Sequence, residues 1–147
     1  MTVSISGLQS VVYPTADLAA AKAWWSALLG VEPYFDEPYY VGFSLNGYEL
    51  GLLPNAPLED GAVAYWGVAN VDVALGDALA AGATEHTPAT DVGEGIITAT
   101  ARTPQGSLVG FIYNPYFKLP NSGGSCPIPG MSALQGMFGM VKAMIAK

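Results

Sequence analysis

Apolar and polar positions at the start of the chain recur in a pattern that predicts one strand followed by one helix. Residues Leu8–Tyr13 form a short apolar run that ends at Pro14, which is typical of a strand. Asp17 is a favourable N-cap residue, apolar side chains then recur at helical spacing over Leu18–Leu29, and Gly30 supplies a stop. We therefore expect a strand and an amphipathic helix.

Three further runs of strand character follow the helix. Asn46-Gly47 lies between the last two runs, and Asn-Gly between apolar runs is the strongest short hairpin signal. The runs are Val31–Phe35, Tyr39–Leu45 and Tyr48–Leu53. The first half of the chain is thus predicted as strand, helix, strand, strand, strand.

The same order of elements returns after a turn-rich linker over Pro54–Gly61. The predicted elements are a strand, a helix and three strands, at Ala62–Val68, Val71–Ala81, Thr84–Val92, Ile96–Ala101 and Leu108–Tyr113. Residues repeat as well, since Gly51-Leu-Leu-Pro-Asn55 corresponds to Gly110-Phe-Ile-Tyr-Asn114. The chain is therefore predicted to contain two β-α-β-β-β modules, about 5–54 and 62–116.

Two such modules predict an α+β fold in which a cupped mixed sheet encloses a central cavity. Each module covers one sheet face with its helix, so the two bare faces must close around something, and the concave space is the natural ligand site. Period-two alternation points Val12, Leu52 and Phe111 toward the helices. The same alternation points a larger set toward the cavity: Gln9, Val11, Tyr13, Glu49, Gly51, Leu53, Tyr65, Leu108, Gly110 and Ile112.

The chain beyond Phe117 departs from the repeat. Residues 118–130 are rich in Pro, Gly and Ser and predict a linker. Apolar residues in 131–147 recur at three and four positions, which predicts a C-terminal amphipathic helix. This helix is expected to dock on its own domain or on a dimer mate, or to cover the ligand groove.

Composition limits the classes of protein that fit. The chain has 147 residues, 51% hydrophobic and 12% charged, which excludes disorder and suits one domain. No apolar run approaches the roughly 20 residues of a membrane-spanning helix, and the start lacks the pattern of a secretory signal, so we expect a cytoplasmic protein. Cys126 is the only cysteine, so no internal disulfide forms.

The formal net charge of −7 argues against two kinds of partner. No lysine or arginine lies between Lys22 and Arg102, where most of the acids are found. Such a field repels nucleic acid and anionic membrane surfaces and attracts cations. The alternative interpretation is that the acids keep an apolar domain in solution.

Several motifs in this order resemble a known superfamily. The stretch from Gly7 to Gly30, with Asp17-Leu18 and the paired Trp24-Trp25, resembles the opening of the vicinal oxygen chelate superfamily. That superfamily includes glyoxalase I, extradiol dioxygenases, fosfomycin-resistance enzymes and bleomycin-binding resistance proteins. The second half matches in Tyr65–Asp72, Ala81–Ala83 and Thr103–Gly106. The resemblance covers about residues 5 to 116 and implies a glyoxalase/bleomycin-resistance-like domain over 1–117.

The resemblance implies a divalent metal held by one ligand from each of four strands. Carried over to this chain, the positions are Gln9, a position near Val63 with Tyr65 next to it, Gly51 or Glu49, and Gly110. At most two ligands are retained, and neither imidazole nor thiolate is among them, which argues against a tight Zn, Ni or Fe site. His86, the only histidine, is expected as an exposed residue of an outer strand.

These residues predict a metal-free protein that binds a small organic molecule. The resemblance to the bleomycin-resistance branch suggests sequestration of an aromatic or cationic compound, with no catalytic residue and no cofactor, by a homodimer. Gly51 and Gly110 are expected to leave room for the ligand. Its contacts are expected to be stacking and polar, from Tyr13, Tyr40, Tyr65, Gln9 and Glu49. The alternative is a metal-dependent lyase or oxygenase of the glyoxalase or dioxygenase type, with a divalent metal in an atypical site.

Overall fold

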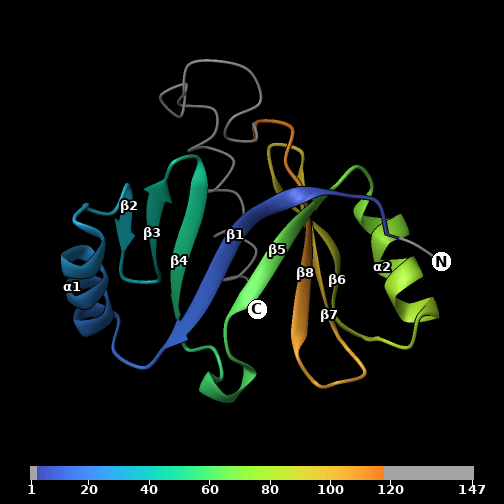
Figure 1. Cartoon of the computed structure of the whole chain (residues 1–147), viewed down its shortest axis with the longest axis horizontal. Helices are drawn as coiled ribbons and strands as arrows, with labels where there is room; N and C mark the ends of the chain where they lie inside the picture. Colours follow the sequence, from blue (N-terminus) through green and yellow to red (C-terminus); the bar gives the residue numbers. More distant parts are fainter. Residues whose placement is uncertain (1–2, 118–147) are drawn as a thin grey trace.

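The two predicted modules form the two halves of one continuous sheet. The computed structural model describes residues 3–117, and within them eight strands pair in the order β2-β3-β4-β1-β5-β8-β7-β6 (Figure 1). The first module contains β1 (Ile5–Thr15), α1 (Leu18–Leu29), β2 (Phe35–Glu37), β3 (Tyr40–Leu45) and β4 (Tyr48–Pro54). The second contains β5 (Val63–Val68), α2 (Val71–Ala80), β6 (Thr84–Gly93), β7 (Ile96–Arg102) and β8 (Leu108–Tyr113). A short 3-10 helix, η1 (Leu58–Asp60), lies in the linker between them.

Strand pairing follows the internal repeat. The first strand of each module pairs in parallel with the last, β1 with β4 and β5 with β8. The modules join where β1 and β5 pair antiparallel. The helices lie at the two ends of the curled sheet, α1 beside β3 and β4 and α2 beside β6, β7 and β8 (Figure 1). This arrangement confirms the predicted α+β fold.

Local signals in the sequence locate the first helix and the hairpin. Asp17 caps α1 by accepting a hydrogen bond from the backbone of Ala20 at 3.0 Å, and Gly30 ends the helix in the left-handed region. Asn46 and Gly47 both have positive φ, as the tight turn of a hairpin between β3 and β4 requires. The strand predicted over Val31–Phe35 instead begins at Phe35.

A bulge in β1 changes which of its side chains face the concave side of the sheet. Leu8 pairs with Trp66 and Ser10 with Tyr65, so Gln9 is an extra residue on β1. After the bulge Val12 packs with Tyr65 on the concave side. The predicted orientation of β1 was therefore wrong beyond Gln9.

Tyr13 is one of the residues that this bulge turns around. It packs on the helix side instead of facing the cavity, with its ring centroid 5.1 Å from that of Trp25 in α1. The alternation prediction holds in strands without a bulge. Leu52 lies in the cluster under α1, and Phe111 lies in the cluster under α2.

The predicted linker 118–130 and C-terminal helix 131–147 lie outside the described residues. Within residues 3–117, no helix is both long enough and apolar enough to span a bilayer.

Candidate functional site

Two repeat-related glycines lie under tyrosine rings from neighbouring strands. A Cβ added to Gly51 would lie 1.9 Å from the Tyr40 hydroxyl oxygen, and one added to Gly110 would lie 2.5 Å from Cδ1 of Tyr65. Tyr40 is fully buried and Tyr65 is 6% exposed. The expectation that these glycines leave room for a ligand is therefore corrected, because the tyrosine rings occupy that space.

Glu49 is a buried carboxylate whose two oxygens are both hydrogen-bonded. Oε1 accepts from the Ser10 hydroxyl at 2.7 Å and from the Tyr40 hydroxyl at 2.9 Å, and Oε2 accepts from the Tyr34 hydroxyl. Burial raises the pKa of Glu49, and the hydrogen bonds from these hydroxyls offset only part of the rise. Burial and then the Glu49 charge raise the pKa of Tyr34 and Tyr40, so both phenols stay protonated and donate.

The concave side of the first module is filled by side chains of its own strands. Tyr40 packs there against Phe35, with ring centroids 6.2 Å apart. Gln9 lies over Gly67, where an added Cβ would come within 2.4 Å of its Nε2. Its buried Oε1 has no hydrogen-bond partner among residues 3–117. Packed aromatic rings and a carboxylate therefore fill the concave side of this module around Glu49.

The residues at the metal positions of the superfamily do not fit a divalent ion. Gly51 and Gly110 carry no donor atom, and tyrosine rings cover both. Glu49 already accepts hydrogen bonds from three hydroxyl groups. Among residues 3–117 no three His, Cys, Asp or Glu side chains gather as a metal site would require. Gln9 Oε1 is then the single oxygen left to ligate a metal, and one neutral oxygen does not make a metal site.

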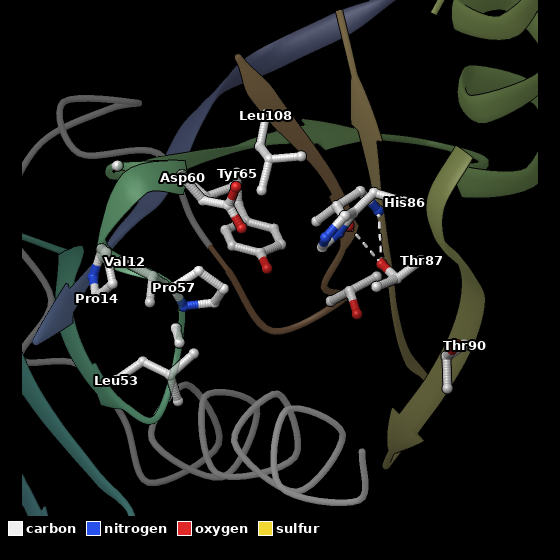
Figure 2. A pocket seen from close by; sticks show the side chains of 15 residues that line it. Val12, Pro14, Leu53, Pro57, Asp60, Tyr65, His86, Thr87, Thr90 and Leu108 are labelled. Carbon is white, nitrogen blue, oxygen red and sulfur yellow. Dashed lines mark hydrogen bonds between the residues drawn. The ribbon is translucent and has the colours of Figure 1, made fainter. Parts of the chain in front are cut away.

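A pocket of about 180 Å³ lies where the two modules meet, between β1, β4 and the linker with η1 on one side and strands β6 and β7 on the other (Figure 2). One wall is apolar and consists of Val12, Pro14, Leu53, Ala56, Pro57, Val63 and Leu108. The facing wall is polar and consists of His86, Thr87, Thr90, Thr98 and Thr100. The Tyr65 side chain extends into the space between these walls (Figure 2). The predicted orientation of Leu53 and Leu108 toward a cavity is confirmed.

A bulge in β6 places His86 in this pocket. Glu85 pairs with Ala101 and Thr87 with Thr100, so His86 is an extra residue on the edge strand. His86 and Thr87 are neighbours in sequence, and both hydrogen-bond the buried Thr100 side chain. His86 is an exposed residue of the outer strand, as predicted, and it also lines the pocket, which the sequence did not indicate.

Sequence reasoning missed the polar wall because strict alternation points adjacent residues to opposite faces. Pro88 within β6 is the one local sign of an irregular edge strand, since proline is confined to strand edges and bulges. It does not indicate where the extra residue lies. The threonines in β6 and β7 are equally typical of an ordinary strand face that is exposed to solvent, so they do not indicate a pocket wall.

An ion pair fastens the linker over the pocket. Asp60 of η1 lines the pocket and accepts from Arg102 Nη2 at 3.1 Å, while Arg102 Nη1 donates to the Gly106 carbonyl at 2.8 Å. Lys22, the one lysine between positions 3 and 117, pairs with Asp36 at 2.9 Å. Both cations of the described chain are therefore engaged in ion pairs.

The residues predicted for ligand contact divide into three groups. Tyr65 lines the pocket. Tyr13 packs against α1 on the other face. The remaining residues are buried in the sheet and its concave packing without lining the pocket: Gln9, Tyr40, Glu49, Gly51 and Gly110.

The sequence matches no family model and no curated protein. The fold is similar to solved structures at low identity. A Mn(II)-bound glyoxalase from Novosphingobium aromaticivorans has a TM-score of 0.62 and 18% identity over 76% of this chain and 40% of that chain. A methylmalonyl-CoA epimerase from Streptomyces coelicolor, in complex with 2-nitronate-propionyl-CoA, has a TM-score of 0.59 and 18% identity over 75% of this chain and 98% of that chain.

A glyoxalase/bleomycin resistance protein/dioxygenase superfamily member from Vibrio splendidus 12B01 has a TM-score of 0.57 and 18% identity over 72% of this chain and 98% of that chain. These proteins share the fold that the sequence resemblance implies, so the comparisons confirm the predicted fold. At this identity the likeness shows the fold alone.

Proposed function

We propose that this chain, whose fold is that of the vicinal oxygen chelate superfamily, binds a small organic molecule in the pocket beside Tyr65 without a metal ion. The observation that carries the proposal is the pocket itself, which has one apolar wall, one polar wall and an aromatic ring between them. Ligand sites typically combine an apolar lining with a few polar groups. Binding of this kind would sequester the compound, as the bleomycin-resistance resemblance suggests.

The pocket volume limits the size of the enclosed ligand. A cavity of about 150 Å³ lined by apolar side chains takes up benzene. The volume here is about 180 Å³. A substituted single aromatic ring therefore fits, and a larger compound would leave most of its surface outside.

The charged residues of the described chain limit the chemical class of the ligand. The epimerase structures in the comparison hold coenzyme A esters. Phosphate groups bind where free cations or helix N-termini meet them. Lys22 and Arg102 are both ion-paired, and no other lysine or arginine lies in the described chain. This supports a neutral or cationic aromatic ligand over a phosphorylated one.

Ligand-induced stabilisation tests the proposal. Acetophenone, ethylbenzene and benzyltrimethylammonium are screened by thermal denaturation, since a compound at a hundred times its Kd adds about 2.7 kcal/mol to the stability of the native state. We expect at least one to raise the Tm of the wild type. Leu53→Trp fills the pocket and should abolish the rise, whereas Leu28→Trp, at an exposed position of α1, should retain it. No rise in the wild type, or an equal rise in Leu53→Trp, would refute binding at this pocket.

Metal analysis separates this function from the metal-dependent alternative. The protein purified without chelator is expected to carry no stoichiometric divalent metal, because its donor set does not fit one. A near-stoichiometric ion that disappears in the Gln9→Ala/Glu49→Ala double variant would replace the proposal with a lyase or oxygenase of atypical site. The predicted homodimer is a separate expectation, and sedimentation equilibrium of the full chain tests it.

A further inference from the structure

The polar wall of the pocket contains a chain of hydrogen bonds that ends at His86. The Thr100 backbone N–H donates to Thr87 Oγ1 at 3.0 Å. The hydroxyl oxygens of Thr87 and Thr100 lie 2.6 Å apart, and Thr100 Oγ1 lies 2.8 Å from His86 Nδ1. The chain therefore runs from the backbone of β7 through two hydroxyls to one imidazole nitrogen.

Counting protons favours one direction for these bonds. Thr87 Oγ1 accepts the Thr100 N–H, so its own proton is available for Thr100 Oγ1. The Thr100 proton is then directed to Nδ1, which accepts it. The opposite direction would leave the Thr87 proton without an acceptor in the chain. With this direction the proton of the neutral His86 imidazole lies on Nε2, which is then a hydrogen-bond donor.

Tyr65 contributes a second donor from the strand opposite. Its hydroxyl makes no hydrogen bond to another residue of the described chain, although the side chain is buried. Burial and the Glu49 charge raise the pKa of Tyr65, so the phenol stays protonated. Figure 2 shows the Tyr65 and His86 side chains both reaching into the pocket. The hydroxyl oxygen itself is open to the pocket, where it can donate a hydrogen bond to a bound acceptor.

We propose that the Tyr65 hydroxyl and His86 Nε2–H bind the carbonyl group of a small aromatic ketone or aldehyde, whose ring lies against the apolar wall. The inference rests on the proposed function and specifies its ligand class. A carbonyl oxygen has two lone pairs and accepts two hydrogen bonds, whereas a hydrocarbon of the same shape leaves both donors unpaired. The two protein donors thus select a carbonyl compound over its hydrocarbon analogue.

The position of the imidazole proton is measured without any ligand. His86 is the only histidine, so its two ring nitrogens give unambiguous ¹⁵N resonances in the labelled full chain. We expect the shifts of a protonated Nε2 and an unprotonated, hydrogen-bonded Nδ1. Thr100→Val and Thr87→Val should shift this pattern toward that of free imidazole, and Thr84→Val, on β6 outside the pocket, should leave it unchanged. A proton on Nδ1 in the free wild type would overturn the inference.

Calorimetric binding of acetophenone and ethylbenzene tests the ligand class. Net hydrogen bonds of ordinary strength predict that acetophenone binds about tenfold more tightly than ethylbenzene. Tyr65→Phe and His86→Phe should each reduce this ratio to a few-fold or less. Tyr113→Phe, which removes a hydroxyl from an exposed tyrosine, should keep it.

The failures of the two proposals are distinguishable. Equal affinities for acetophenone and ethylbenzene, with binding of both lost in Leu53→Trp, would refute the carbonyl site and leave the proposed function standing. Absence of binding by either compound and by benzyltrimethylammonium would refute the proposed function and the carbonyl site with it.

Discussion

Gly51→Ala is the substitution that most directly tests how the first half of the cup is packed. The added Cβ would lie 1.9 Å from the Tyr40 hydroxyl oxygen and 2.6 Å from its Cζ, closer than any real contact. The Tyr40 ring is fully buried, and its hydroxyl donates to Glu49 Oε1 at 2.9 Å. The ring therefore has no open space into which it could retreat without lengthening this bond.

The magnitude follows from these two costs. Overpacking a well-packed core costs roughly 1–3 kcal/mol, and weakening a hydrogen bond to a charged group costs about 1.5–3 kcal/mol. The two costs are not additive, because a movement of the Tyr40 ring that relieves the overpacking also lengthens the hydrogen bond to Glu49. We expect Gly51→Ala to lower the free energy of unfolding by about 3 kcal/mol.

Urea denaturation followed by circular dichroism measures this change. With a slope of roughly 2 kcal/mol per molar urea, the midpoint should fall by about 1.5 M. Gly76→Ala is the matched control, because Gly76 lies inside α2 with no atom within 4 Å of an added Cβ. The same chemical change should there raise the free energy of unfolding by about 0.5–1 kcal/mol, through helix propensity.

A change of less than about 0.5 kcal/mol in Gly51→Ala, the scale of an ordinary surface substitution, would refute the reasoning. It would mean that Gly51 borders open space, as the sequence alone suggested. A double-mutant cycle with Tyr40→Leu adds a second criterion. The double variant should be more stable than the sum of the single changes predicts, by about 1 kcal/mol or more, because the side chains clash directly.

Further predictions concern one ionisable group, one helix cap and one ion pair. Burial raises the pKa of Glu49 above its ordinary 4.5, so the contribution of this group to stability is fully present below that pH and is lost as the pH rises. In urea melts at increasing pH, the free energy of unfolding of the wild type should therefore fall relative to that of Glu49→Gln. A difference between the two that stays constant with pH would contradict this. Asp17→Ala removes the α1 cap and should cost about 1 kcal/mol by chemical denaturation, with loss of no more than a few tenths counting against the cap. Arg102→Gln should cost less than about 1 kcal/mol, since the ion pair is partly exposed, and should tighten calorimetric binding of benzyltrimethylammonium severalfold by freeing the Asp60 charge; unchanged affinity would show that this charge does not reach the ligand.

Local signals predicted most of the fold. The Asp17 cap, the Gly30 stop and the Asn46-Gly47 turn each depend on residues close in sequence, and each is found where it was predicted. The repeat predicted the order of the elements, and hence the pairing of two equivalent modules. Alternation also oriented Leu52 correctly.

The ligand site was less predictable, because it depends on where strands break their alternation. One extra residue at Gln9 turned Tyr13 away from the cavity, and another at His86 turned that side chain into the pocket. A bulge depends on how two strands distant in sequence pair, so neither strand alone indicates it. The metal positions illustrate the same limit. Glycine at 51 and 110 indicated missing ligands, but not that tyrosines would occupy the space.

The sequence by itself determined the two modules, their helices and the superfamily resemblance, because periodicity, caps and turns act over a few residues. Only the tertiary structure decided that Tyr40 and Glu49 fill the concave side of the first module and that a pocket stays open beside Tyr65, where the modules meet. The physical reason is that a cavity is the volume left after side chains from several strands have packed. That remainder depends on register and on the reach of each side chain across strands.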